Sequence, residues 1–209
     1  MPIMSTLPSG KSENSAGSLV QCLVTDLNSD DQHRYQQARK KLVSMGPNVV
    51  LDLVERMPLA PNKLRFRLIM TICEMKDKSA TLDLIPYLDS DSPPIQAVVA
   101  QFLGESGDDV AAEALIKQLN SKKESQSLTW TIQALGKLRA KRAVYPLIQI
   151  MHETDSGSTR YTAIEALGLI GDPVAISEIT RYVNDTDHHV YDRAKTALET
   201  LYKLNGAYP

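Results

Sequence analysis

The chain of 209 residues has few of the features that mark secreted, metal-binding or membrane proteins. Its two cysteines, Cys22 and Cys73, are too few for a disulfide framework and too widely spaced for a metal-binding pair. No apolar run approaches the roughly 18 residues of a membrane span, and the first residues lack the basic start and continuous apolar stretch of a signal peptide. We therefore expect a cytoplasmic protein that does not insert into a membrane.

Aromatic residues and net charge are also scarce. Aromatic residues make up 5% of the chain, and 23 Lys and Arg against 25 Asp and Glu leave a formal net charge of -2. Proteins that bind nucleic acid normally carry a basic face, often with aromatic side chains that stack on bases. The composition therefore argues against a nucleic-acid partner, including the DNA of a glycosylase. The segment from Lys137 to Arg142, KLRAKR, is basic, and it is either a solvated turn or a contact for an acidic partner.

The N-terminal segment differs in composition from the rest of the chain. Residues 1–18 are rich in Ser, Pro and Gly, which predicts a flexible tail. Hydrophobic residues make up 43% of the whole chain, which suits a packed core. We expect residues 19–205 to form the folded part.

An internal repeat of 30–32 residues organises that part. Gly104, Gly136 and Gly168 share a column with Cys73, and small or apolar residues stand one and five positions before each column residue. Since these two positions are four residues apart, they lie on one face of a helix. A second apolar segment follows, anchored eleven residues after the column at Val54, Leu84, Leu115, Leu147 and Ile179.

Turn residues separate the two segments of each unit. Gly171 is predicted to end a first helix in a left-handed cap, and Asp172-Pro173 to begin the second helix, whereas Gly168 lies at a close-packing position inside the first. A phosphate-binding loop would follow a strand, so these glycines do not predict one. Each unit is a helical hairpin that needs stacked neighbours to bury its apolar faces. The predicted fold is an all-α solenoid of five hairpins and a C-terminal half repeat.

These columns resemble HEAT repeats of the short kind found in phycobilisome lyases. The resemblance covers most of the chain beyond the tail. The matching residues are Arg160, Ala163, Ala166-Leu167-Gly168, Gly171-Asp172, Ile176 and Ile179, together with Ala134-Leu135-Gly136 and Ala143-Val144-Tyr145-Pro146-Leu147.

The resemblance has two implications. One is a partial ladder of ion pairs between units, formed by Asp77, Asp108 and Asp172 with Arg65 and Arg160. The other is a role as a subunit of a phycobilin lyase or lyase-isomerase, or of the related phycobilisome-degradation machinery. Such a subunit would hold an open-chain tetrapyrrole, its phycobilin cofactor, and a phycobiliprotein, as one half of a heterodimer.

Candidate metal ligands are sparse. His152-Glu153 resembles one of the His-Glu pairs of a HEAT-like diiron hydroxylase, but no other unit carries such a pair. Asp185, Asp187, His188 and His189 are suitable ligand types, yet they also fit a turn in which Asp187 caps the last helix. We therefore predict no metal site.

The cysteines do not point to catalysis either. Cys73 is interpreted as a small packing residue in the glycine column, and Cys22 as a buried residue of a helix over the first repeat. The side chains expected on the concave surface, given below, include no carboxylate pair and no nucleophile beside a base, so no catalytic residue is predicted.

A partner is expected on the second helices, which usually line the concave surface of such a stack. The side chains two and three positions after the anchors are Arg56, Tyr87, Lys117, Gln118, Gln149, Arg181 and Tyr182. Arg, Tyr and long polar side chains are typical of protein interfaces. Trp130, in a mostly polar and presumed outward-facing column that also holds Thr162, is a further candidate anchor.

The main hypothesis is therefore a scaffold or adaptor that binds another protein without a cofactor and without catalysis of its own. The alternative is a subunit of a phycobilin lyase, whose partner would be a phycobiliprotein or a second lyase subunit. The sequence leaves the identity of the partner and the oligomeric state open.

Overall fold

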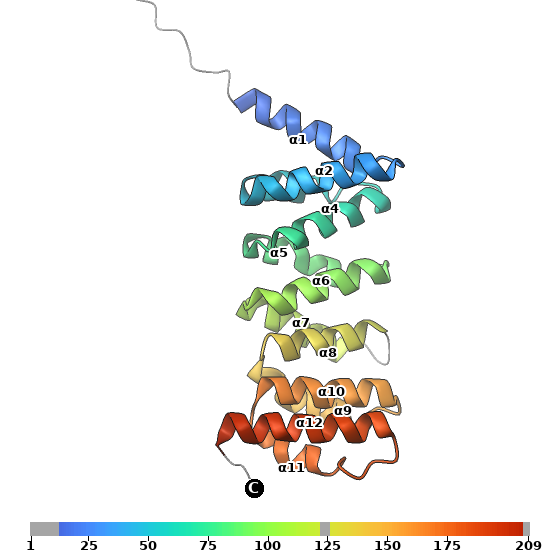
Figure 1. The fold of residues 1–209 in the computed structure, drawn as a ribbon, viewed down its shortest axis with the longest axis vertical. Coiled ribbons are helices and arrows are strands. Elements are labelled where there is room, and N and C mark those ends of the chain that lie inside the picture. Colours follow the sequence, from blue (N-terminus) through green and yellow to red (C-terminus); the bar gives the residue numbers. More distant parts are fainter. Residues whose placement is uncertain (1–12, 122–125, 207–209) are drawn as a thin grey trace, which may run out of the picture. The chain divides into compact units, whose positions relative to one another are not determined.

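A computed structural model describes residues 13–121 and 126–206 and divides the chain into two compact units, Met1–Asp77 and Lys78–Pro209. The described residues form helices and turns without any strand, which confirms the all-α prediction (Figure 1). Within this part of the chain, no helix is long and apolar enough to cross a membrane.

The first unit contains a helix that precedes the repeats. Its elements are α1 (Glu13–Leu27), α2 (Gln32–Met45), η1 (Gly46–Val49), α3 (Val50–Arg56) and α4 (Asn62–Met75), where η denotes a 3-10 helix. Helix α1 packs on α2 and α4 through Val20, Val24 and Leu27, which recur along one helical face and are buried.

Two expectations about this region need correction. Helix α1 begins at Glu13, so residues 13–18 are helical and only residues 1–12 of the predicted tail lie outside the described residues. Ser and Gly in residues 13–18 suggested a tail. Composition alone cannot show that α1 begins several residues before the buried apolar residue Val20. Cys22 is exposed rather than buried, because it lies on the face of α1 opposite Val20 and Val24.

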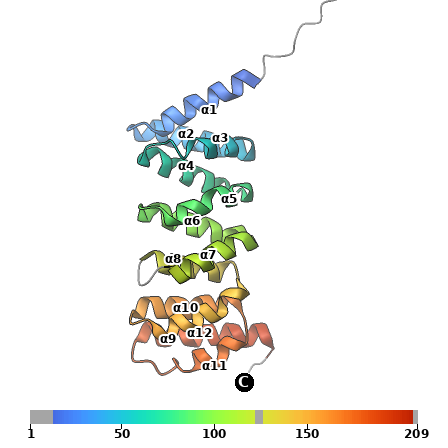
Figure 2. The same cartoon turned by 180° about the vertical axis from the view of Figure 1, so that it is seen from behind.

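The second unit contains the clearest repeats (Figure 2). Its first helices are α6 (Pro93–Ser106), α8 (Gln126–Lys137), α10 (Gly157–Ile170) and α12 (His188–Asn205), which pack on one another in that order. Its second helices are α5 (Thr81–Leu84), α7 (Asp109–Ser121), α9 (Val144–Glu153) and α11 (Val174–Thr180), which also pack in order. Short 3-10 helices η2 (Lys78–Ala80), η3 (Ile85–Asp89) and η4 (Lys141–Ala143) flank α5 and begin the α9 segment.

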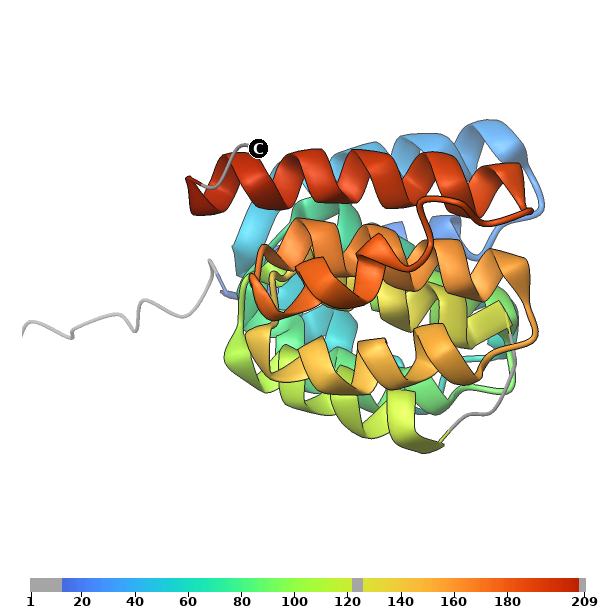
Figure 3. The same cartoon turned by 90° about the horizontal axis from the view of Figure 1, so that it is seen from below.

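Successive hairpins therefore stack, as the repeat predicted. Helix α12 is the unpaired half repeat, and it covers the end of the stack against α10 and α11 (Figure 3). The anchors Leu84, Leu115, Leu147 and Ile179 are all fully buried. We call the exposed side of α5, η3, α7, α9 and α11 the second-helix face.

The glycine column marks the places where first helices approach most closely. A Cβ atom on Gly136 would lie 2.8 Å from the Cα of Ala166 on α10. Gly104 meets Ala134 in the same way, at 2.8 Å. The predicted close-packing role is confirmed, and the structure adds the facing residue, an alanine two positions before the next column residue.

The turns end and begin helices as predicted. Gly171 adopts φ +81 and its N–H donates to the carbonyl of Leu167 at 3.2 Å. The Asp172 carboxylate then accepts a hydrogen bond from the N–H of Val174 at 3.0 Å. Glycine reaches this left-handed region at little cost, whereas a Cβ atom is disfavoured there.

The predicted Arg–Asp ladder is wrong for both arginines. Arg65 donates to the carbonyls of Met57 at 2.9 Å and Ala60 at 2.8 Å, and Arg160 donates to the carbonyls of Met151 and Thr154. The last carbonyls of a helix have no partner within it, and a guanidinium offers five donors. Each arginine therefore binds the end of the preceding second helix.

Candidate functional site

The structure separates the predicted partner-binding residues by unit and by exposure. Those on the second-helix face that are exposed or half-buried are Tyr87, Lys117, Gln149, Arg181 and Tyr182. Arg56 belongs to the first unit, where it is half-buried and donates a hydrogen bond to the side chain of Gln21 on α1. A candidate surface can therefore be built only from the five residues of the second unit.

Gln118 is not part of that surface. It is only 6% exposed, its amide donates to the carbonyl of Leu88 at 2.7 Å, and its side-chain oxygen accepts from the Thr131 hydroxyl at 2.7 Å. A residue three positions after the buried anchor Leu115 lies on nearly the same helical face, which explains its burial. Gln118 ties η3, α7 and α8 together, so the prediction that it contacts a partner is wrong.

Arg181 and Tyr182 belong to a polar cluster that joins α9 to α11. The Tyr182 hydroxyl lies 2.8 Å from Nδ1 of His152, and the two rings stack with centroids 5.8 Å apart. Nε2 of His152 lies 2.9 Å from the Glu178 carboxylate, which also accepts from Arg181 at 3.2 Å. We call His152, Glu178, Arg181 and Tyr182 the α9–α11 cluster.

The cluster is satisfied in either protonation state of its histidine. Ionised Glu178 can only accept, so Nε2 of His152 carries a proton. With neutral imidazole, the Tyr182 hydroxyl donates to Nδ1; with imidazolium, Nδ1 donates and the hydroxyl turns to the carbonyl of Met151, 3.2 Å away. The cluster therefore holds its side chains in place across this protonation change.

The electrostatics of the cluster keep two of its members in one ionisation state at neutral pH. Hydrogen bonds from His152 and then from Arg181 lower the pKa of Glu178. Burial raises the pKa of Tyr182. Glu178 is therefore a carboxylate and Tyr182 a neutral phenol at neutral pH. The arrangement holds an anion, a guanidinium and stacked rings together at a surface.

Sequence reasoning missed two members of this cluster, His152 and Glu178. His152 was weighed only with its neighbour Glu153, whose carboxylate instead accepts from Gln149 at 2.9 Å. The available signal was the repeat itself, because His152 and Tyr182 stand 30 residues apart. Residues one repeat apart on second helices are neighbours across the stack.

The acidic and histidine-rich turn before α12 caps that helix. The Asp187 carboxylate accepts from the N–H of His189 at 2.9 Å, as predicted, and Asp185 accepts from the N–H of Asp187 at 2.8 Å. His188 lies 3.3 Å from Asp192. Throughout residues 13–121 and 126–206, no group of three or more His, Cys, Asp or Glu side chains is placed to hold a metal ion.

Trp130 lies in a groove between α6 and α8. It is half-buried, and the groove of about 230 Å³ is lined also by Ala97, Gln101, Gln133, Ala134 and Lys137. The expectation of an outward-facing column fails at Thr162, which is 1% exposed and donates to the carbonyl of Ser158, and the other members range from half-buried to exposed. Trp130 thus presents one part of its ring to the groove.

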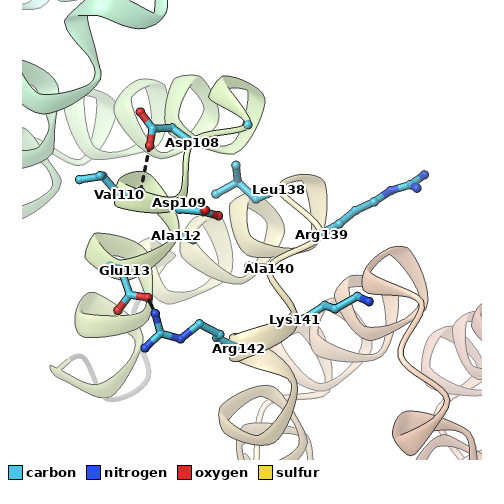
Figure 4. A pocket seen from close by; sticks show the side chains of 11 residues that line it. Asp108, Asp109, Val110, Ala112, Glu113, Leu138, Arg139, Ala140, Lys141 and Arg142 are labelled. Atoms are coloured by element: carbon cyan, nitrogen blue, oxygen red, sulfur yellow. Dashed lines mark hydrogen bonds and ion pairs between the residues drawn. The ribbon is translucent and has the colours of Figure 1, made fainter.

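The basic segment forms the turn between α8 and α9, and a cavity of about 500 Å³ separates it from the α6–α7 turn (Figure 4). Lys137 lies 3.6 Å from Glu105, and Arg142 forms an ion pair with Glu113. The lining of the cavity includes Asp108, Asp109, Val110, Glu113, Leu138, Arg139, Ala140, Lys141 and Arg142. Acidic, basic and apolar groups therefore meet at this edge.

Comparison with known proteins gives a family signal and a fold signal. Residues 50–135 and 128–201 match the family model for HEAT repeats. No curated protein sequence matches the chain.

Among solved structures, an engineered protein is similar at TM-score 0.58 and 19% identity, over 88% of this chain and 97% of that chain. A chain from the complex of CpcE and CpcF of phycocyanin lyase from Nostoc sp. PCC7120 is similar at TM-score 0.57 and 21% identity, over 96% of this chain and 82% of that chain. Human deoxyhypusine hydroxylase in complex with glycerol matches at TM-score 0.45 and 14% identity, over 91% and 98% of the two chains. The first two likenesses show the fold.

Proposed function

Because the chain belongs to the HEAT-repeat family, we propose that it is an interaction scaffold that binds a partner protein on the second-helix face of its Lys78–Pro209 unit. The α9–α11 cluster carries this proposal. The Arg181 side chain is 68% exposed while Glu178 holds its guanidinium, and Tyr182 is fixed by His152. Arg and Tyr are frequent anchors of protein interfaces, and ordering them beforehand lowers the entropy lost on binding.

The rest of the second-helix face suits the same role. Lys117 and Gln149 are exposed on α7 and α9, and Tyr87 is half-buried on η3. These side chains sit on helices whose anchors are fully buried, so the surface is displayed by a rigid layer. We propose that the protein acts without catalysis of its own and in the cytoplasm, which the cysteine usage favours.

A pull-down with the tagged full chain from a native cytoplasmic extract tests this proposal. The double variant Arg181→Ala/Tyr182→Ala should lose a partner that the unaltered chain recovers reproducibly, with affinity reduced about tenfold or more. A matched control is Lys195→Ala/Tyr202→Ala on α12. It likewise removes one cation and one tyrosine, but from a helix that is not part of the second-helix face. Recovery that falls equally in both variants, or in neither, would contradict the proposed face.

A second candidate function is that of a phycobilin lyase subunit or a related phycobilisome assembly or degradation factor. The likeness over 96% of this chain to a chain of the CpcE–CpcF complex favours it. In that role the partner would be a phycobiliprotein or a second lyase subunit. Proximity of a bilin and a substrate cysteine would then supply most of the rate enhancement.

The described residues do not by themselves fit the bilin well. An open-chain tetrapyrrole with two propionates needs a site lined by cations and apolar groups. The 500 Å³ cavity has cations in its lining, but it is lined by Asp108, Asp109 and Glu113 as well. Inside the cavity these carboxylates would repel the propionates, whereas Arg139 and Lys141 extend to the side away from Asp108 and Glu113 (Figure 4). We therefore propose that, if this role holds, the second subunit completes the bilin site.

Absorption spectroscopy separates the two candidate functions. The protein is mixed with free phycocyanobilin or phycoerythrobilin, alone and with candidate partner subunits, and the visible band is followed. A shifted band supports the lyase role. An unchanged band in every mixture removes it and leaves the scaffold proposal in place.

A further inference from the structure

We infer that the turn between α8 and α9 binds an acidic segment of a protein partner that carries an apolar side chain. The surface consists of Val110, Arg139, Lys141 and Arg142, which line the 500 Å³ cavity, and of the exposed Tyr145 one turn beyond Arg142; we call it the basic-turn surface. This inference rests on the proposed scaffold function and adds the chemistry of the partner.

Two cations of this turn form no ion pair with the residues that the structure describes. Lys137 and Arg142 have carboxylate partners in Glu105 and Glu113. Arg139 and Lys141 are exposed, and neither forms an ion pair with any residue in the described part of the chain. Figure 4 shows both side chains extending to the same side, away from Asp108 and Glu113. The positive charge is thus separated from the acidic wall of the cavity and available to a ligand.

The backbone at Arg139 is unusual. Arg139 adopts φ 52, a left-handed conformation, three positions after the column residue Gly136. The equivalent turn positions of neighbouring hairpins hold Gly107 at φ 66 and Gly171 at φ 81. A side chain in this region carries a conformational cost that glycine avoids, and such costs tend to persist where the side chain has a function.

A structural explanation for Arg139 also exists, and it makes a different prediction. A cation at the C-terminal end of α8 interacts favourably with the helix dipole, and Lys76 at φ 55 has a similar place at the end of α4. If that were the whole role, glycine at position 139 would lower stability. If Arg139 serves binding, glycine should leave stability unchanged or raise it while binding weakens.

Apolar groups complete the surface. Tyr145 is 71% exposed and follows Arg142 by three residues, and Val110 is 46% exposed on the opposite wall of the cavity. Helical residues three apart lie side by side, so the Tyr145 ring lies next to Arg142 at the edge of the basic turn. The cavity volume accommodates a ligand side chain. Proteins that bind single-stranded nucleic acid stack bases on aromatic side chains, and aromatics make up only 5% of this chain, so an acidic protein segment fits better than nucleic acid.

Peptide selection tests the chemistry directly. A displayed library of random twelve-residue peptides is selected on the full chain, with counter-selection on Arg139→Gly/Lys141→Ser. We expect enriched peptides to carry net negative charge and at least one bulky apolar residue. Fluorescence polarisation of an enriched peptide should show binding weakened about three- to thirtyfold by the double variant. The control Lys195→Ser/Lys203→Ser removes the same charge from α12 and should bind as the unaltered chain does.

Each outcome decides the inference. Peptides without acidic residues, equal weakening by both double variants, or tighter binding of a single-stranded oligonucleotide than of any peptide would overturn it. A loss of stability in Arg139→Gly, measured by urea unfolding, would assign the residue to the helix end. If Arg139→Gly/Lys141→Ser leaves a native partner bound while Arg181→Ala/Tyr182→Ala releases it, this inference fails and the proposed function stands.

Discussion

The substitution Gly136→Ala tests how closely the first helices pack. The new Cβ atom would lie 2.8 Å from Cα and 2.9 Å from Cβ of Ala166 on α10, so α8 and α10 must move apart by several tenths of an ångström. Because one of the two neighbouring atoms belongs to the backbone, no rotamer change relieves the contact. We therefore expect the variant to be less stable than the unaltered protein.

The size of the effect follows from two opposing terms. Overpacking in a dense interior costs about 1–3 kcal/mol. Alanine in a helix interior is favoured over glycine by about 1 kcal/mol. The net loss for Gly136→Ala should therefore be about 1 kcal/mol. Gly17→Ala in α1 is the reference, because nothing lies within 4 Å of its added Cβ, and it should gain up to about 1 kcal/mol.

Urea unfolding followed by far-ultraviolet circular dichroism measures both changes. The free energies of unfolding of the two variants, each referred to the unaltered protein, should differ by about 1–3 kcal/mol, the overpacking term alone. Adding Ala166→Gly to Gly136→Ala removes one of the two close contacts, so the double variant should be more stable than the sum of the single changes. A Gly136→Ala variant that gains as much as Gly17→Ala would refute the close approach of α8 and α10.

Three further predictions concern the candidate site. Gln118→Met should lower the free energy of unfolding by about 1–3 kcal/mol, because it removes two buried hydrogen bonds, and should be seen in urea unfolding. Trp130→Ala should weaken partner association in the pull-down. Because Trp130 is half-buried, the loss in the free energy of unfolding should be smaller than the roughly 3–5 kcal/mol lost when a fully buried tryptophan is replaced by alanine. The lowered pKa of Glu178 means that its ionised form stabilises the tie between α9 and α11 above the usual glutamate pKa, and that this contribution is lost as pH falls through the lowered value. Amide hydrogen exchange in α11 should therefore speed up as the pH falls below the usual glutamate pKa, after correction for intrinsic rates.

The controls use neighbouring side chains. Gln149→Met changes an exposed amide and should leave unfolding unaltered; an equal loss in both glutamine variants would show that burial of Gln118 is not the cause. For the pH effect, Glu178→Gln should make α11 exchange insensitive to pH in the same range. Persistence of the acid effect in that variant would assign it to another carboxylate. A Trp130→Ala chain that loses stability like a core variant and still binds would assign the ring to packing.

The repeat made most of the fold predictable. The repeat column, the apolar positions four apart and the glycines three residues beyond the column located the helices, the turns and the anchors of the second unit. In the first unit the predicted anchor Val54 is half-buried, and its neighbour Leu53 is buried instead. These features are local or periodic, and a hairpin that recurs must bury its faces against its copies. Residue Gln118 was misplaced because a spacing rule counts positions, whereas burial depends on the angle around the helix.

The candidate site depended more on tertiary structure. The sequence named Arg181, Tyr182 and the basic turn, and it predicted a surface for a protein partner rather than a catalytic pocket. Only the packing of α9 on α11 brought His152 and Glu178 to these residues, and only the backbone showed Arg139 in a left-handed conformation, which the neighbouring hairpins leave to Gly107 and Gly171. Periodicity determines which residues share a helix face. Contacts across helices depend on side-chain direction and on the distance between helix axes. The missing Cβ of Gly136 lets α8 approach the Cα of Ala166 closely, and only the tertiary structure shows that these two residues face each other.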